Sequence, residues 1–278
     1  MNAGTGALRV IAQIENVEHF VGSDFADTLA GGLGVNQLDG GSGNDLLLGR
    51  GGDDILNDGA GVDRLNGQLG ADTMTGGADS DVYDVDNVGD VVIEEAGGGN
   101  SDRVNTVVDF TSGGNIEFIV GKFAPIGLTL VGAGGVDRIT GANKISFGDD
   151  ISGEGGNDKL IALVGNDDID GSGGNDRIFG NSGDDTITGG TGNDRVRGNQ
   201  GSDTFIHRIG DNNDTITDSN VNADVLDLID HGFSSFAEVM ALATDTALGV
   251  QIDLAGADSV LLQGVVKAAI GSEDILIV

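Results

Sequence analysis

The stretch GSGGNDRIFGNSGDDTITGGTGNDRVR, residues 171–197, repeats one pattern three times, with nine residues in each row. The pattern is G-G-x-G-x-D-x-U-x, in which U is a large apolar residue. Glycines at the first, second and fourth positions permit positive φ, so each row is expected to begin with a tight turn. The x-U-x tail has the composition of a strand but is too short to be stable by itself. Because such rows can bury their apolar residues only against one another, the stretch predicts a stacked solenoid.

The same period extends outward through two arrays of seven rows each, residues 22–84 and 144–206. A looser row, residues 132–140, precedes the second array and is offset from it by three residues. In the first array the sixth positions are Asp27, Asn36, Asp45, Asp54, Asp63, Asp72 and Asp81, and the eighth are Leu29, Leu38, Leu47, Leu56, Leu65, Met74 and Tyr83. In the second array the sixth positions are Asp149, Asp158, Asp167, Asp176, Asp185, Asp194 and Asp203, and the eighth are Ile151, Leu160, Ile169, Ile178, Ile187, Val196 and Phe205.

Two rows are expected to form one coil, so each strand should lie beside its equivalent eighteen residues away in a parallel sheet. The sixth-position aspartates of alternate rows then line up about 4.8 Å apart. Two carboxylates at that distance repel by about 3 kcal/mol at an effective dielectric near 20. A calcium ion between successive turns reverses the sign, because it takes six to eight oxygen ligands. Calcium binding and folding are therefore expected to be coupled.

The composition favours a hard cation as the ligand. The 278 residues include 51 glycines and no cysteine, and the formal net charge is −33. Such a charge argues against nucleic acid or anionic membrane as a partner, and the lack of cysteine leaves oxygen ligands and three histidines. No segment is apolar enough to predict insertion into a membrane, and the first twenty residues have no Sec-type signal. Export, if it occurs, is expected to use another route.

GGSGNDLLL at 40–48, GSGGNDRIF at 171–179 and GGTGNDRVR at 189–197 resemble the nonapeptide of the RTX (repeats-in-toxin) proteins, the substrates of Gram-negative type I secretion. The resemblance implies a β-roll that holds several calcium ions, each between two rows on the same side. One row would offer carbonyls from its first, third and fifth residues. The other would offer carbonyls from its second and fourth residues together with its sixth-position aspartate.

The resemblance implies a specific set of calcium-binding residues. The aspartates are Asp45, Asp54, Asp63, Asp72, Asp81, Asp149, Asp158, Asp167, Asp176, Asp185, Asp194 and Asp203. The glycines are Gly40, Gly49, Gly153, Gly156, Gly171, Gly174, Gly180, Gly183, Gly189 and Gly192. The best-matching pairs begin at 153 and 171, 171 and 189, 180 and 198, 49 and 67, and 40 and 58. Asp176 is thus expected to have same-side partners on both sides, and Asp158 and Asp194 one each.

Some rows depart from the nonapeptide. Phe25, Phe147 and Asp79 replace the fourth-position glycine, Asn36 replaces a sixth-position aspartate, and the row 162–170 opens with Ala-Leu-Val. These turns are expected to be poorer calcium sites.

The predicted fold is an all-β parallel β-roll, a β-solenoid with two repeat blocks. We expect leader strands at 1–21, the first block at 22–84, an irregular β connector with non-metal turns at 85–143, and the second block at 144–206. Residues 207–278 should form a β-rich cap with one short helix, which Ser235 and Glu238 begin with capping-box spacing. The cap ends in Glu273, Asp274 and the apolar residues 275–278, which resemble a C-terminal type I secretion signal.

Catalytic signatures are missing from the sequence, which has no H-E-x-x-H, G-x-S-x-G or Walker motif. His19, His207 and His231 are interpreted as surface or capping residues, and the connector acids, Glu94 and Asp102 among them, as a solvated edge. We therefore expect a secreted, extracellular calcium-binding protein and not an enzyme.

Two functions remain open from the sequence. The first is a structural or adhesive module of a cell surface, surface layer or matrix. Its β-roll would fold on binding Ca²⁺ after type I secretion, and its partners would be calcium, the type I transporter during export, and either copies of itself or a surface glycan. The second is the non-catalytic C-terminal RTX region of a secreted metalloprotease, lipase or alginate epimerase.

Overall fold

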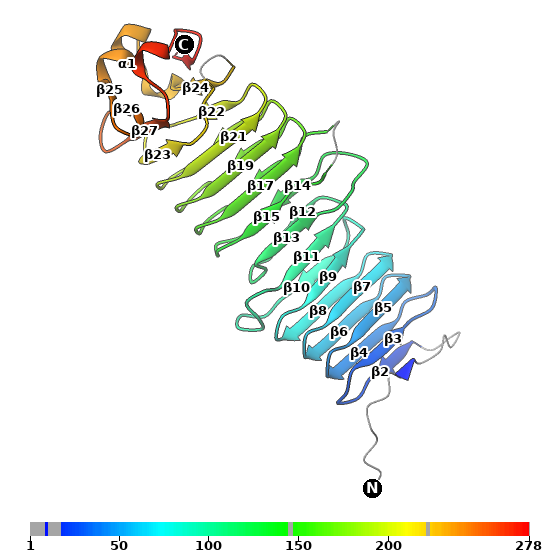
Figure 1. Ribbon diagram of the computed structural model, residues 1–278. Helices are drawn as coiled ribbons and strands as arrows, with labels where there is room; N and C mark the ends of the chain where they lie inside the picture. Colours follow the sequence, from blue (N-terminus) through cyan, green and yellow to red (C-terminus); the bar gives the residue numbers. More distant parts are fainter. Residues whose placement is uncertain (1–8, 11–17, 144–146, 221–222, 278) are drawn as a thin grey trace. The chain divides into compact units, whose positions relative to one another are not determined.

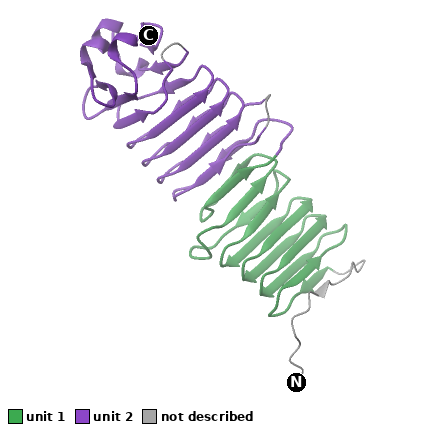
Figure 2. Ribbon diagram, in the orientation of Figure 1, with its two compact units in different colours: residues 1–122 green, residues 123–278 purple. Residues whose placement is uncertain are grey.

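The computed structural model describes residues 9–10, 18–143, 147–220 and 223–277. Most of the predicted leader, the first three residues of the second repeat block and Val278 lie outside these residues. The chain divides into two compact units, Met1–Lys122 and Phe123–Val278 (Figure 2). In each unit short parallel strands stack coil upon coil (Figure 1), which confirms the predicted β-solenoid.

In unit 1, successive strands alternate between two parallel sheets. One sheet contains β1 (Arg9–Val10), β3 (Asp27–Ala30), β5 (Leu46–Gly51), β7 (Arg64–Leu69), β9 (Val82–Val85), β11 (Arg103–Thr106) and β13 (Phe118–Gly121). The other contains β2 (His19–Val21), β4 (Gln37–Ser42), β6 (Ile55–Ala60), β8 (Thr73–Ala78) and β10 (Val91–Ile93). The short strand β12 (Phe110–Thr111) also belongs to this unit. Leu38 pairs with Leu56 and Leu56 with Met74, so the predicted eighteen-residue register is confirmed.

Unit 2 repeats this arrangement and adds a cap. One sheet runs through β15 (Arg138–Thr140), β17 (Lys159–Val164), β19 (Arg177–Ser182), β21 (Arg195–Gln200) and β23 (Asn213–Ile216), and then β27 (Ser259–Gln263), β26 (Gly249–Asp253) and β25 (Ala243–Asp245). The other contains β14 (Thr129–Val131), β16 (Asp150–Ser152), β18 (Asp168–Asp170), β20 (Thr186–Thr188), β22 (Thr204–Ile206), β24 (Val225–Asp227) and β28 (Ile275–Leu276).

The cap contains the predicted helix and an antiparallel hairpin. Strands β25, β26 and β27 pair antiparallel, so β27 closes the parallel stack by pairing with β23. The helix α1 (Phe236–Leu242) packs against β26, and the Ser235 side chain accepts a hydrogen bond from the Glu238 N–H at its start. The 3₁₀ turns η1 (Ile229–His231) and η2 (Lys267–Ala269) complete it. No helix of the described residues is long and apolar enough to cross a membrane.

The eighth-position residues form the core of both units. In the thirteen rows from Leu29 to Tyr83 and from Leu160 to Phe205 each of these side chains is at most 3% exposed, and Ile151 is fully buried. A single column of apolar side chains between two sheets leaves little other core, so the acidic turns at the edges of the stack have a large effect on stability.

The repeat also continues into the predicted connector. Residues 85–93 keep the nine-residue register, with Asp90 in sixth place and Val92 in eighth, and Val92 pairs with Met74. After an offset of three residues, Asp102 and Val104 take the same two places, and Val104 pairs with Tyr83.

Candidate metal centres

A ladder of hydrogen bonds joins the sixth-position residues of successive coils. The backbone N–H of Asp158 donates to Oδ1 of Asp176 at 2.7 Å, and the N–H of Asp176 donates to Oδ1 of Asp194 at 2.7 Å. In unit 1 the N–H of Asp45 donates to Oδ1 of Asp63 at 2.7 Å in the same way. Each aspartate therefore uses one carboxylate oxygen to fix the stacking, and its other oxygen is left for a different partner.

That second oxygen, Oδ2, is buried and has no hydrogen-bond partner among the described residues in eleven of the predicted ligands. They are Asp45, Asp54, Asp63, Asp72, Asp81, Asp158, Asp167, Asp176, Asp185, Asp194 and Asp203. An ionised carboxylate in such a position is costly unless a cation or a proton compensates it. Burial, opposed by the hydrogen bond from Asp158, accordingly raises the pKa of Asp176 to about 6. Burial raises the pKa of Asp158 to about 7.

The first-position glycine keeps the space beside Oδ2 free. A Cβ added to Gly153 would lie 2.6 Å from Oδ2 of Asp158 and 2.9 Å from the carbonyl oxygen of Gly171. Among the described rows, positive φ occurs at the second and fourth positions, as at Ser172 (68°) and Gly174 (131°), but not at the first. The expectation of positive φ at the first position is therefore wrong, because that glycine is needed for room and not for its backbone conformation.

In the described rows, carboxylate and carbonyl oxygens thus lie around a space from which side-chain carbon is excluded, and these rows contain no histidine or cysteine. This is the ligand chemistry of a hard cation such as Ca²⁺. The residues present therefore fit calcium.

The first aspartate or asparagine of each column has a different turn. Oδ2 of Asp27 accepts a hydrogen bond from the Ser23 N–H, and Oδ1 of Asn36 accepts one from the Gly32 N–H, each at 2.7 Å. Oδ2 of Asp149 likewise accepts from the Ala142 N–H at 2.6 Å, while its Oδ1 accepts from Leu128. Asp149 is therefore the one predicted carboxylate ligand whose two oxygens both have backbone partners.

The rows that depart from the nonapeptide fall into two groups according to the backbone conformation of their turns. Neither Phe25 nor Phe147 has positive φ. Asp79 adopts φ 75° in the place of glycine, and Leu163 adopts φ 85° in the row 162–170. These last two rows keep the turn geometry despite their sequences.

The ladder extends beyond the predicted rows. The N–H of Asp137 donates to Asp158, and that of Asp194 donates to Asp214, so Asp158 and Asp194 have partners on both sides, contrary to the expectation of one each. Asp203 donates in the same way to Asp224. The repeat pattern did not identify Asp90, Asp102, Asp214 and Asp224 as members of this ladder. The register of residues 85–93 could have revealed Asp90, whereas insertions hide the other three.

The described residues of unit 1 include two groups of three carboxylates, and the ligand atoms of each group lie within 4.8 Å of one another. The groups are Asp45, Asp58 and Asp63, and Asp81, Glu94 and Asp102. Glu94 is 9% exposed and Asp102 is fully buried. The interpretation of these two connector acids as a solvated edge is wrong, because the coil places them in the interior of the turn.

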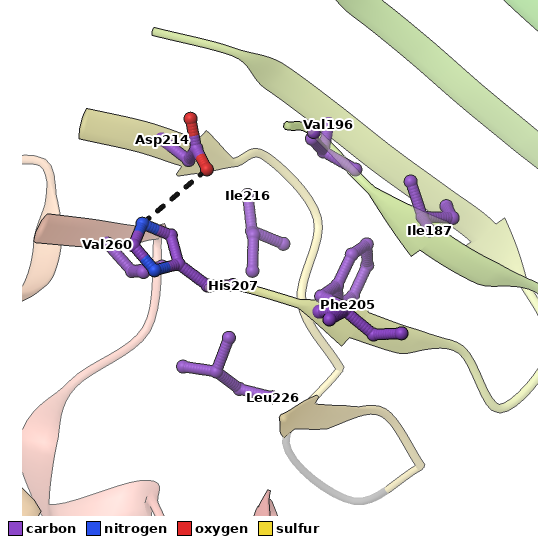
Figure 3. Close-up of a pocket in the computed structure, with 10 residues that line it drawn as sticks. Ile187, Val196, Phe205, His207, Asp214, Ile216, Leu226 and Val260 are labelled. Carbon is purple, nitrogen blue, oxygen red and sulfur yellow. Dashed lines mark ion pairs between the residues drawn. The ribbon is translucent and has the colours of Figure 1, made fainter. Parts of the chain in front are cut away.

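His207 lies buried beneath the cap, in a pocket whose walls include Val196, Phe205 and Ile216 (Figure 3). Its Nε2 atom is 3.6 Å from Oδ2 of Asp214, and its Nδ1 atom is 3.2 Å from Nε2 of His231. Burial lowers the pKa of His207. Both ring nitrogens therefore have neighbours, as expected of a capping residue, while His19 is exposed.

The match to a protein-family model agrees with this geometry. Residues 21–56, 48–83, 146–178, 170–205 and 179–216 match the RTX calcium-binding nonapeptide repeat. No curated protein matches the chain. Among solved structures, the chain is similar to the extracellular lipase LipA from Serratia marcescens, with 20% identity and a TM-score of 0.40 over 91% of this chain. The chain spans 40% of the length of that lipase.

Proposed function

Because this chain is an RTX calcium-binding nonapeptide-repeat protein, whose repeats bind Ca²⁺, we propose that it is a secreted structural or adhesive module whose rolls fold when calcium fills their turns. The observation that carries the proposal is the column of buried, unpartnered Oδ2 atoms on both edges of the stack. The proposed carboxylate ligands are the eleven aspartates with such an atom, and the glycine-rich turns supply the carbonyl ligands.

The difference in calcium concentration between the cytosol and the outside of the cell supports the coupling of folding to export. Extracellular calcium modules have dissociation constants of roughly 10⁻⁴–10⁻³ M, far above the calcium concentration of a cytosol. Inside the producing cell the acidic columns stay uncompensated, and the chain is unfolded and can pass through a type I transporter. Outside the cell calcium binds, and the binding free energy becomes folding free energy.

The distribution of residues supports a structural role. Nonapeptide repeats are non-catalytic, and the described acidic residues that are buried lie mainly in the repeating turns. The exposed surface of a protein with a formal charge of −33 favours contact with cations, or with surfaces through bridging calcium. Attachment to a cell surface or matrix, by self-assembly or through a glycan, is the role we propose for the loaded rolls.

Chelation tests this function. Exhaustive treatment with EGTA at pH 7.5 is expected to abolish most of the β signal in circular dichroism, and millimolar calcium should restore it cooperatively. Light scattering of the loaded protein, with and without a surface polysaccharide, then measures assembly and binding. An unchanged spectrum after chelation would overturn calcium-coupled folding, and a loaded protein that stays monomeric and binds no surface material would overturn the adhesive role.

A further inference from the structure

Two turns of unit 1 carry an acidic residue at a first position, where the repeat takes glycine. Asp58 opens the row 58–66. Glu94 follows Gly76 by eighteen residues and therefore stands in the same column of first positions. Glycine at this place leaves the room beside Oδ2 of the sixth-position aspartate, so a carboxylate in its place brings a further pair of oxygens to the turn.

Asp58 is directed into the turn of the preceding coil. It is 1% exposed, and neither of its carboxylate oxygens has a hydrogen-bond partner among the described residues. A Cβ added to Gly40 would overlap Oδ1 of Asp58 and lie 2.7 Å from Oδ2 of Asp45. The Asp58 carboxylate thus fills the space that Gly40 leaves open and joins the carboxylates of Asp45 and Asp63.

No basic side chain compensates this charge. The ion pairs of the described residues do not include Asp58, and Asp58 takes no part in the N–H ladder. Burial, followed by the charges of Asp63 and Asp45, raises the pKa of Asp58 to about 9. An ionised Asp58 needs a cation beside it. Without a cation the carboxylate must be protonated, and the substitution is then a defect of the roll.

The Glu94 turn groups three carboxylates in the same way, although Oε1 of Glu94 accepts a hydrogen bond from the Glu95 N–H. Glu94 lies within 4.8 Å of the carboxylates of Asp81 and Asp102, which occupy the sixth positions of two successive coils. Asp81 and Asp102 are fully buried, and Oδ2 of each lacks a partner in the described part of the chain. The Tyr83 hydroxyl donates a 2.5 Å hydrogen bond to Oε2 of Glu94, which fixes the orientation of the glutamate. Two separate sequence departures therefore build one arrangement, which a chance defect would not.

We propose that Asp58 and Glu94 are calcium ligands, and that their two three-carboxylate turns are the tightest calcium sites of the protein and fill before the ordinary turns. The same-side pair of rows 171–179 and 189–197 contains no carboxylate besides its two sixth-position aspartates, whereas each of these turns brings a third carboxylate within 4.8 Å of two such aspartates. Calcium affinity rises with the charge of the ligand set, and the oxygen-only chemistry selects a hard cation. The inference rests on the proposed function, because it assumes that calcium fills the turns.

The test depends on whether the substitution D58G raises or lowers the affinity for calcium. D58G restores the repeat glycine, so it should tighten calcium binding if Asp58 is a defect and weaken it if Asp58 is a ligand. Calorimetric titration of the wild type with Ca²⁺ is expected to show a tight class of two ions followed by a weaker class. D58G and E94Q should each reduce the tight class to one ion, with a loss of about tenfold or more in affinity at the altered turn. D58N, which keeps the size of the side chain, should act as D58G does.

D253N is the matched control, because Asp253 is an exposed acid at the end of β26 in the cap, outside the repeating turns. It removes the same charge and should leave the tight class at two ions. A wild type with one uniform class of sites, or a D58G variant that binds calcium more tightly, would overturn this inference while calcium-coupled folding still stands. A wild type that binds no calcium would overturn the proposed function as well.

Discussion

The N–H of Asp158 donates a 2.7 Å hydrogen bond to Oδ1 of Asp176, and Oδ2 of Asp176 is left buried without a partner in the described structure. One carboxylate thus does two things: it fixes the stacking of two coils and offers an oxygen to a cation between them. The stacking bond needs only a hydrogen-bond acceptor, whereas the free oxygen needs a counter-charge. Substitutions that separate these two roles are therefore informative.

Asp176→Ala is expected to remove or weaken two calcium sites, because Asp176 has ladder partners in the coils on both sides. Asp158→Ala should have an equal effect, since Asp158 lies between Asp137 and Asp176. Asp149→Ala serves as the control, because both of its oxygens already accept backbone hydrogen bonds. Calcium stoichiometry by calorimetry measures all three. If Asp149→Ala loses as many ions as Asp176→Ala, the free Oδ2 atom is not the determinant of the site.

Gly171→Ala tests the role of the first-position glycine. The new Cβ would lie 2.6 Å from Oδ2 of Asp176 and would overlap the carbonyl oxygen of Gly189. We expect a loss of about 1–3 kcal/mol in the free energy of unfolding of the calcium-loaded protein, typical of overpacking, and a higher calcium midpoint. Gly135→Ala is the control, since a Cβ there meets nothing within 4 Å. Equal calcium midpoints for Gly171→Ala and Gly135→Ala would contradict the proposal that the ion occupies the space beside Oδ2 of Asp176.

The C-terminal residues of the cap are predicted to act in export. Asp274 accepts a hydrogen bond from the Leu226 N–H through its carbonyl, and β28 pairs with β24, so this segment is part of a sheet once the protein has folded. Deletion from Glu273 onward is expected to block secretion from a Gram-negative host with a matching type I transporter, while the rolls still bind calcium. Immunoblots of medium and cells, with a calcium titration of the purified variant, measure both. Normal secretion of the truncated chain would show that these residues are not the secretion signal.

The sequence predicts the fold wherever the nine-residue period is unbroken, because the period alone determines which residue enters the core. Leu29, Leu47 and Leu65 pair in one sheet for that reason. It does not predict the continuation to Asp102 and Asp214, since insertions between coils change the spacing while leaving the stacking intact.

The sequence also does not separate Asp58 from Asp79. Both replace glycine, yet Asp58 is buried in a turn and Asp79 is exposed. The difference arises from the position in the row: Asp58 takes the first position, and its carboxylate lies beside Gly40 inside the turn, whereas Asp79 takes the fourth position, with φ 75°, and is exposed. Only the coiled backbone reveals which acidic side chains lie close to one another.

The calcium-free rolls are expected to be stable in acid and to unfold as the pH rises. Burial raises the pKa of Asp54, Asp63 and Asp185 from 3.8 to about 6, and that of Asp81 to about 7. Because the folded-state pKa lies above the unfolded value, protonation favours the folded state. The stabilisation is fully present below about pH 4 and is lost as the pH rises through about 6 to 7.

This dependence has the opposite sign to ordinary acid denaturation, in which carboxylates that are paired in the folded state lose their partners on protonation. In EGTA, the β signal in circular dichroism should therefore be near that of the calcium-loaded protein at pH 4 and should be lost by pH 8. The same titration in millimolar calcium should show no loss at neutral pH, since the ion replaces the proton at Oδ2. Light scattering must accompany the acid end, because the pI of about 4.1 favours association there. A chelated protein that is equally folded at pH 4 and pH 8 would mean that the buried carboxylates have another compensating partner.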